Sequence, residues 1–295
     1  MKCFDKKILA LILAGGKGER LYPLTLERTK PSVPFGGKYR IIDFSLSNLI
    51  NSGVYSIYIL VQYKSQSLIE HIRTTWVTAG FPADHFITVV PPQMRKEDVK
   101  DWYRGTADSV YQNINLIYDF NPDLVVVFSG DHIYRMDVRD MIEYHLRKKA
   151  ELTMSVVPIE EKEKVSQFGV VKIDKRMGIV KFKEKPKGIG EGLYFLSMGN
   201  YIFNTEVLIE ALDKDAKRPT SHDFGKDIIP LMVREKRKVY AYDCSKNRIP
   251  NLKSYEARFY WKDVGTIKAY WEANMDLLGK SPRLDLDNQA WPIYA

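Results

Sequence analysis

The chain has 295 residues, 45% of them hydrophobic, so it can bury a substantial core and is poorly suited to a disordered or fibrous state. Its apolar runs are short, and the run over residues 8–14 is far below the roughly 20 residues of a membrane-spanning helix, so we expect no membrane contact. Two cysteines give no disulfide framework, and the formal net charge of +8 favours anionic partners, either phosphorylated metabolites or nucleic acid.

Short runs rich in Val, Ile and Leu predict strands that are buried on both faces, as in a parallel sheet covered by helices. In the first half of the chain these runs are residues 8–13, 56–61, 86–90, 124–128 and 152–157. A helical pattern covers residues 106–118, with Thr106 and Asp108 as candidate caps. Alternating strands and helices indicate right-handed βαβ units and therefore an α/β fold.

From Gly169 onward the pattern changes to alternating strands, at residues 170–173, 179–183 and 198–203, which predicts a mixed sheet. A final helix is predicted over residues 266–278. We expect one catalytic domain over residues 1–280, followed by a C-terminal tail or the start of a linker over residues 281–295. The N-terminus lacks the pattern of a cleavable signal, which predicts a cytoplasmic protein.

A glycine-rich loop, Ala14-Gly-Gly-Lys-Gly-Glu-Arg-Leu21, follows the first predicted strand. Glycines let backbone N–H groups approach phosphate oxygens, and the start of a following helix would add partial positive charge. The loop matches neither the dinucleotide fingerprint nor the P-loop, and by itself it also fits a tight turn. The cations Lys17, Arg20, Arg28 and Lys30 crowd the same region, which favours a polyphosphate ligand.

Two carboxylates follow predicted strands. Asp131 stands just beyond the strand at residues 124–128, at the carboxyl end where open α/β sheets bind ligands, and Asp263 precedes the last predicted helix. Two such oxygen ligands suit Mg²⁺ bound to phosphates, although an Asp in this position is also typical of a turn or helix cap. The histidines do not have the spacing of a zinc site, and we expect His132 and His222 to stabilise turns.

Several longer motifs carry a family resemblance. The glycine loop with Pro23-Leu-Thr25 and Lys30-Pro31 resembles the signature of nucleotide-sugar pyrophosphorylases. The segments Phe35–Asn48, Trp102–Asp108 and Ser221–Asp227 resemble the glucose-1-phosphate adenylyltransferase branch of that family. The resemblance implies a Rossmann-like nucleotidyltransferase fold whose mixed, predominantly parallel sheet is flanked by helices. It also implies transfer of AMP from ATP to glucose 1-phosphate, giving ADP-glucose and pyrophosphate for glycogen or another α-glucan.

The resemblance assigns roles to individual residues. The implied catalytic residues are Arg20, Lys30 and Asp131, and the implied Mg²⁺ ligands are Asp131 and Asp263. Glucose 1-phosphate is expected at Tyr103, Gly169, Glu184, Lys185 and Ser197, with Lys185 on its phosphate and Glu184 on the sugar hydroxyls. The nucleotide is expected at Ala14, Gly15, Gly16, Gly18, Gln93 and Gly105. Gln62 and Trp102 match positions that relay regulation to the active site.

Other readings stay open at this point. The same reaction could use another pair of nucleotide and sugar phosphate, or the chain could be a non-catalytic regulatory subunit, although its charged site residues argue against that. Nucleic-acid binding rests on net charge alone, and we expect none. Family members normally continue into a left-handed β-helix that contributes to tetramer assembly, whereas this sequence ends at Ala295, so a homo-oligomer is an open expectation.

Overall fold

The computed structural model describes residues 5–76, 82, 84–92, 102–159, 162–190 and 192–295. Its central sheet consists of β1 (Ile8–Ala14), β4 (Ser56–Val61), β5 (Phe86–Val90), β6 (Leu124–Ser129), β8 (Leu152–Pro158), β9 (Gly169–Ile173), β10 (Ile179–Glu184), β11 (Tyr194–Asn204) and β12 (Val239–Asp243). Two small sheets pair β2 (Pro34–Phe35) with β3 (Tyr39–Arg40), and β7 (His132–Tyr134) with β13 (Trp261–Asp263).

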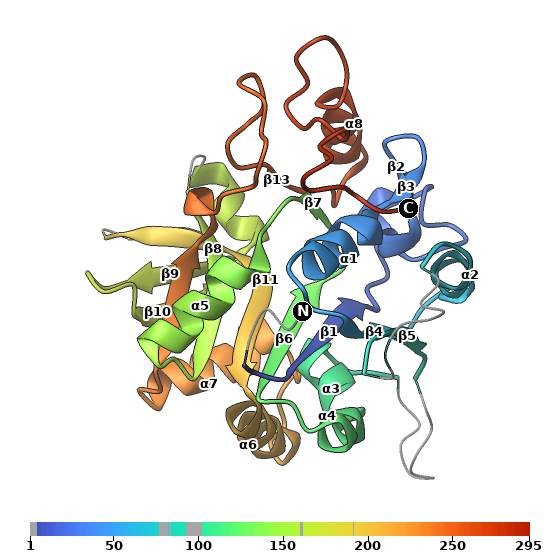
Figure 1. Cartoon of the computed structure of the whole chain (residues 1–295). Helices are drawn as coiled ribbons and strands as arrows, with labels where there is room; N and C mark the ends of the chain where they lie inside the picture. Colours follow the sequence, from blue (N-terminus) through green and yellow to red (C-terminus); the bar gives the residue numbers. More distant parts are fainter. Residues whose placement is uncertain (1–4, 77–81, 83, 93–101, 160–161, 191) are drawn as a thin grey trace.

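The central sheet is mixed, as the sequence predicts. Its path is β10-β9-β11-β6-β1-β4-β5 (Figure 1). Strand β8 lies between β11 and β12. The strands β6, β1, β4 and β5 run parallel to one another, whereas β11 is antiparallel to β6, β8 and β9. The apolar runs became strands because both of their faces are covered: Leu9 and Leu11 of β1 enter one core, and Ala10 and Ile12 enter another.

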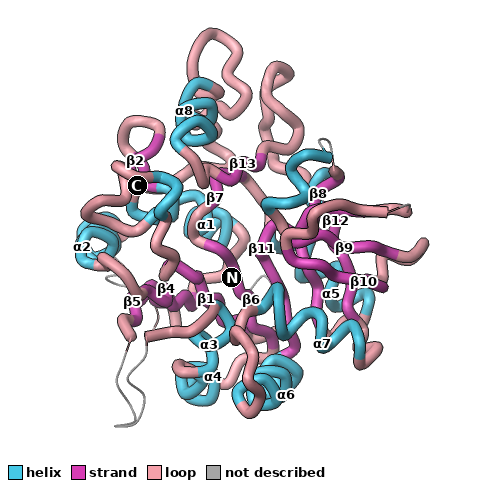
Figure 2. Tube along the Cα trace, turned by 180° about the vertical axis from the view of Figure 1, so that it is seen from behind, coloured by secondary structure: helices cyan, strands magenta, loops and turns pink. Residues whose placement is uncertain are grey.

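Helices cover both faces of the sheet. They are α1 (Ile41–Asn51), α2 (Gln66–Thr75), α3 (Thr106–Tyr111), α4 (Ile114–Phe120), α5 (Val138–Lys148), α6 (Thr205–Ala216) and α7 (Ile229–Arg234). The helix α8 (Ile267–Met275) lies apart from the central sheet, and its Ala273 joins a separate apolar cluster. Buried side chains of α1, α2 and α5 join one core, and those of α3, α4, α6 and α7 join the other. Accordingly α1 and α5 lie across the sheet in Figure 1, and α7 lies across it in the reverse view of Figure 2. The result is the predicted Rossmann-like α/β fold.

Four local predictions were wrong in detail. The helix expected over residues 106–118 is interrupted, because Asn113 leaves helical geometry and its side-chain amide donates to the Ser109 carbonyl and to the Tyr103 hydroxyl oxygen. The first residue of α3 is preceded by Gly105, and the Thr106 hydroxyl bonds Asp223 and Phe224 instead of capping the helix. The last helix ends at Met275, and the glycine loop leads into a single 3₁₀ turn, Glu19–Leu21.

Residues 281–295 are irregular and pack against the rest of the chain. Trp291 is 2% exposed, and its indole N–H donates to Asn48 Oδ1 on α1. The backbone N–H of Tyr294 donates to Ser47 on the same helix. Within the described residues, none of the helices combines the length and the apolar character needed to cross a membrane.

Candidate functional site

A cavity of about 780 Å³ opens at the carboxyl ends of β1, β4 and β6. This is the edge of a parallel sheet where ligands bind, because consecutive loops diverge there. Its lining comes from distant parts of the chain: residues 13–20, Lys30, Pro31, residues 60, 62–63 and 103–106, Ser109, Ser129, Asp131, Glu184, Lys185, Gly199, Tyr201, residues 223–225 and Gly265. The cavity therefore brings together most of the site residues predicted from the sequence.

The glycine loop forms one wall of the cavity. Gly18 has a φ of 64°, in the left-handed region that favours glycine, and its carbonyl accepts a hydrogen bond from the Thr25 hydroxyl at 3.0 Å. Ala14, Gly15 and Gly16 also line the wall, and Gly16 is exposed. The backbone of this loop is therefore accessible to a ligand, as the prediction of a phosphate site requires.

Three of the four predicted cations border the cavity. Lys17 and Arg20 are exposed, and the Arg20 guanidinium lies against Gly265 on the loop that follows β13. Lys30 is buried, with an 8% exposed side chain. The fourth, Arg28, is not among the described lining residues, and its charge acts instead on Arg40 outside the cavity, where it contributes to a lowered Arg40 pKa after the larger effect of burial. The predicted cluster is therefore smaller than the sequence indicates.

Lys30 bridges the two predicted metal carboxylates. Its Nζ is 3.0 Å from Asp131 Oδ2 and 2.6 Å from Asp263 Oδ1. Burial lowers the pKa of Lys30, but attraction to the two carboxylates outweighs it, so the pKa lies above its ordinary value. Burial likewise raises the pKa of Asp131, yet the Lys30 and His132 charges and the Ser129 hydroxyl hold it well below its usual range.

His132 stands beside this pair. It was expected to stabilise a turn, but it lies on β7, directly opposite Asp263 on β13, with its Nε2 3.5 Å from Asp131 Oδ1. His132 is 8% exposed, and its Nδ1 has no partner among the described residues. One ligand atom from each of Asp131, His132 and Asp263 lies within 4.8 Å of the others. Two carboxylates with a nearby imidazole are a donor set that fits a divalent cation.

Glu184 and Lys185 border the cavity from the end of β10. Lys185 has a φ of 45° and a side chain that is 58% exposed, with its Nζ 3.7 Å from Glu184 Oε1. Burial raises the pKa of Glu184, and the Asp223 carboxylate adds to this, while Lys185 and Lys226 oppose it. The anionic form of Glu184 is therefore less favoured than that of an exposed glutamate.

Two predicted sugar-site residues lie behind the cavity wall. Gly169 is opposite Glu184 in the β9–β10 register, and Ser197 is 7% exposed and accepts a hydrogen bond from the Gly199 N–H at 3.2 Å. Neither is among the described lining residues, although Gly199 and Tyr201 next to Ser197 are. Strand β11 therefore brings Gly199 and Tyr201 to the cavity, and sequence alone did not indicate them.

The loop over residues 102–105 contributes a further part of the cavity lining. Tyr103 and Gly105 line the cavity, and a Cβ added to Gly105 would lie 2.3 Å from the carbonyl oxygens of both Ser221 and His222. Those carbonyls belong to the Ser221–Asp227 motif, so two motifs far apart in sequence are in direct contact here. The predicted base contact Gln93 lies outside the described residues.

Gln62 and Trp102 both attach this loop to the end of β4. The Gln62 amide donates to the Tyr103 carbonyl at 3.3 Å, and the Trp102 ring stacks on Tyr63 with centroids 5.5 Å apart and planes 7° apart. Tyr63 lines the cavity, and the Lys17 ammonium lies 5.3 Å from its ring centroid. Of the two predicted relay residues, Gln62 therefore lines the cavity itself, and Trp102 contacts Tyr63, which also lines it. Tyr63 is a lining residue that the sequence did not indicate.

Comparison with known proteins gives a consistent result. A family profile described as "Nucleotidyl transferase" matches residues 9–280. The chain is 55% identical over 293 residues to a Thermodesulfovibrio yellowstonii protein named glucose-1-phosphate adenylyltransferase, covering 98% of this chain and 70% of that protein. It is 50% identical over 295 residues to a protein of the same name from Thermus thermophilus, covering 97% of this chain and 70% of that protein. A glucose-1-phosphate adenylyltransferase 1 from Vibrio cholerae gives the same three percentages as the Thermus protein.

Proposed function

The chain belongs to the nucleotidyl transferase family and is a nucleotidyltransferase, and we propose that it transfers AMP from ATP to glucose 1-phosphate. The products are ADP-glucose and pyrophosphate, and the ADP-glucose supplies glycogen or another α-glucan. The proposal rests on the relatives' names together with one structural observation. The glycine loop, Asp131, and the pair Glu184 and Lys185 all border a single cavity, so a triphosphate and a sugar phosphate can meet there.

The reaction itself explains why the site is rich in charge. A phosphate oxygen of glucose 1-phosphate forms a bond to the α-phosphorus of ATP. The bond from that phosphorus to the oxygen bridging the β-phosphorus breaks, and its electron pair leaves with pyrophosphate. Because the nucleophile is already anionic at neutral pH, no general base is needed. Catalysis then depends on positioning two anions and on stabilising the charge of the transition state.

Charged residues near the glycine loop would bind the reacting phosphates and the divalent cation. Arg20 and Lys30 neutralise the triphosphate and the departing pyrophosphate. Asp131 and Asp263 hold a divalent cation, which we take to be Mg²⁺ because both ligands are hard oxygens. When bound, the cation would supply positive charge at the reacting phosphates. The Ser129 hydroxyl donates to Asp131 Oδ1 and so fixes the orientation of that carboxylate.

The remaining predicted residues fit binding roles. The backbone at Ala14, Gly15, Gly16 and Gly18 would receive the nucleotide phosphates, and Gly105 and Gln93 would lie at the base. Tyr103 and Glu184 would bind the sugar and Lys185 its phosphate, with Gly169 and Ser197 supporting the wall from behind. Gln62 and Trp102 would couple movements of the 102–105 loop to the glycine loop, since both contact residues that line the cavity.

Three broader expectations stay proposals. Residues 1–280 form the catalytic domain, and residues 281–295 form a tail or the start of a linker. The protein acts in the cytoplasm, where ATP and sugar phosphates occur, and the low cysteine content agrees with a reducing compartment. Assembly as a homo-oligomer stays an open proposal.

The test is pyrophosphate release by the purified chain with Mg²⁺ and glucose 1-phosphate, comparing ATP, UTP, dTTP and GTP. We expect a strong preference for ATP, and a loss of about 100-fold or more in kcat for Asp131→Asn. A preference for another nucleotide would keep the chemistry and replace the substrate. A folded chain without turnover with any nucleotide would refute the proposal and favour a regulatory subunit.

A further inference from the structure

Lys30 occupies the position between Asp131 and Asp263. Its ammonium contacts one oxygen of each carboxylate, at 3.0 and 2.6 Å, and these are the two groups that the proposed function assigns to the divalent cation. The carboxylates reach this point from β6 and β13, and Lys30 reaches it from a 3₁₀ turn that follows the glycine loop. The same cluster of oxygens therefore serves as partner to a side-chain cation and as candidate ligand set for a metal ion.

The local charge disfavours two cations on the same pair of carboxylates. Two carboxylates and one ammonium carry a net charge of −1, and the Lys30 and Asp263 side chains are only 8% and 14% exposed, so water screens them weakly. A divalent cation bound to the same oxygens would lie within a few ångströms of the ammonium, with like charges facing each other.

The Lys30 ammonium has an alternative position in the cavity. Its side chain lines the cavity, so its ammonium can turn from the carboxylates into the space that the triphosphate would fill. The base of the side chain is held in place, because its Cβ packs beside Gly18 and the backbone of the turn is closed by the Ser32 and Val33 N–H groups. Motion of the chain end alone would therefore suffice.

Resting on the proposed function, we propose that Lys30 and the divalent cation compete for the carboxylates of Asp131 and Asp263. The cation binds by displacing the Lys30 ammonium, which turns to the nucleotide phosphates. Lys30 thus acts first as a resident cation that keeps the carboxylate pair together, and then as a phosphate ligand. Metal binding and the arrangement of Lys30 for catalysis become one coupled event.

Substituting Lys30 tests this through the sign of its effect on metal affinity. If the Lys30 ammonium is paired with the carboxylates most of the time, only the small unpaired fraction of the protein can bind the cation, and the apparent affinity falls in proportion to that fraction. Lys30→Met should therefore tighten Mn²⁺ binding by about fivefold or more. Mn²⁺ is titrated into the full chain without nucleotide or sugar phosphate, and the free ion is followed by electron paramagnetic resonance. Lys17→Met is the matched control, because Lys17 also lines the cavity but pairs with Glu19 at 3.8 Å.

Two results would overturn the proposal. Weaker Mn²⁺ binding by Lys30→Met would mean that Lys30 orients the carboxylates for the metal, and unchanged binding would mean that it serves the phosphates alone. Asp263→Asn, which should weaken Mn²⁺ binding in both backgrounds, verifies that the titration reports this site. Because no substrate is present, the titration does not depend on turnover, so its outcome and that of the pyrophosphate assay are distinguishable.

A second measurement needs no substitution. The unaltered chain is treated with acetic anhydride, with and without Mn²⁺, and acetylation of each lysine is followed by mass spectrometry. Displacement predicts that Mn²⁺ raises the labelling of Lys30 by about twofold or more while Lys17 stays unchanged. Unchanged or reduced labelling of Lys30 at saturating Mn²⁺ would contradict displacement, even if Lys30→Met fails to fold.

Discussion

Glu184 shows at the scale of a single residue how a binding role can oppose stability. Burial and the nearby Asp223 raise its pKa, so the folded protein binds this proton more tightly than the unfolded chain does. Stability is therefore lost as pH rises from the unfolded pKa, near the ordinary value of 4.5, through the higher folded pKa. At neutral pH the ionised carboxylate is a cost to the fold, which is common for groups kept for function.

Replacing this carboxylate should separate stability from binding. We expect Glu184→Gln to raise Tm at pH 7 by roughly 1–3 °C, with the difference vanishing below about pH 4, where the carboxyl is protonated in both states. Binding of glucose 1-phosphate should weaken, raising its KM by about tenfold. Thermal melts from about pH 3 to about pH 8 check the first effect, with the exposed Glu27→Gln as control. A lower Tm for Glu184→Gln at pH 7 would show that Glu184 stabilises the fold.

Gly105 and Gly16 differ in the space available for a side chain. A Cβ at Gly105 would meet two backbone carbonyls at 2.3 Å, whereas a Cβ at Gly16 has no described neighbour within 4 Å. We expect Gly105→Ala to lower the free energy of unfolding by about 2–4 kcal/mol, because backbone atoms must move to make room for the methyl group. Urea unfolding measures this change. Gly16→Ala should leave stability within about 0.5 kcal/mol but raise the KM for ATP, since a methyl group blocks the phosphate approach. Equal stabilities for the two variants would refute this contrast.

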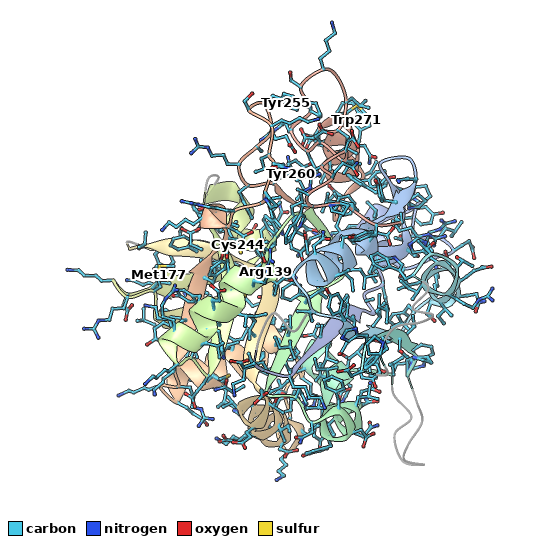
Figure 3. The ribbon with its side chains drawn as sticks, in the orientation of Figure 1. Arg139, Met177, Cys244, Tyr255, Tyr260 and Trp271 are labelled. Atoms are coloured by element: carbon cyan, nitrogen blue, oxygen red, sulfur yellow. The ribbon has the colours of Figure 1, made fainter. Side chains whose placement is uncertain are left out.

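Among the elements, α8 has a stripe of exposed apolar side chains. Ile267, Trp271, Met275 and Leu278 recur at helical spacing in and just after it, with exposures of 42%, 59%, 39% and 63%. Figure 3 shows Trp271 on this helix and Tyr255 on a neighbouring loop, both at one end of the molecule. A contiguous apolar surface of this kind favours association.

The stripe predicts how the purified chain behaves at high concentration. We expect Trp271→Ser to raise the concentration at which the chain self-associates in sedimentation experiments, while Tm stays within about 1 °C because little packing is lost. Tyr118→Ser is the control, since Tyr118 is 57% exposed but lies on α4. Equal effects of the two substitutions on self-association would show that general surface polarity, and not the stripe, controls it.

At the scale of the whole molecule, residues 281–295 are connected to the candidate site through hydrogen bonds to α1. Asn48 Oδ1 accepts hydrogen bonds from the Trp291 indole and from the Met136 N–H, and the Asn48 amide donates to the Tyr134 carbonyl at 3.1 Å. Tyr134 ends β7, the strand that begins next to Asp131. Residues near the end of the chain therefore help to hold the strand that positions the carboxylate pair.

We expect Trp291→Ala to destabilise the protein by about 3–5 kcal/mol, because it empties a buried indole site and leaves Asn48 with one fewer donor. Urea unfolding measures the loss. Tyr294→Ala, which removes a side chain that is 43% exposed, should cost about 1 kcal/mol or less. A loss of similar size in both variants would mean that the whole segment, and not the Trp291 anchor, stabilises the fold.

The sequence by itself determined the elements whose cause is local. The apolar run over residues 56–61 became the strand β4 with those bounds, because burial on both faces requires continuous hydrophobicity. The run over residues 86–90 became the edge strand β5, also with the predicted bounds, although most of its side chains are only partly buried. The glycine loop lies at the end of β1 and Asp131 just past β6 for a similar reason, since loops at the carboxyl ends of parallel strands meet at one edge. The family motifs indicated the chemistry, and the comparisons agree with it.

Only the tertiary structure decided which charges face each other. Lys30 lies 101 residues from Asp131 and 233 from Asp263 in the sequence, and their contact depends on the pairing of β7 with β13, which no local pattern specifies. The same pairing places His132 beside the carboxylates, although residue type and spacing predicted a turn. Side-chain partners across such distances depend on register and burial, because a strand pattern fixes which face a residue occupies but not which strand lies opposite.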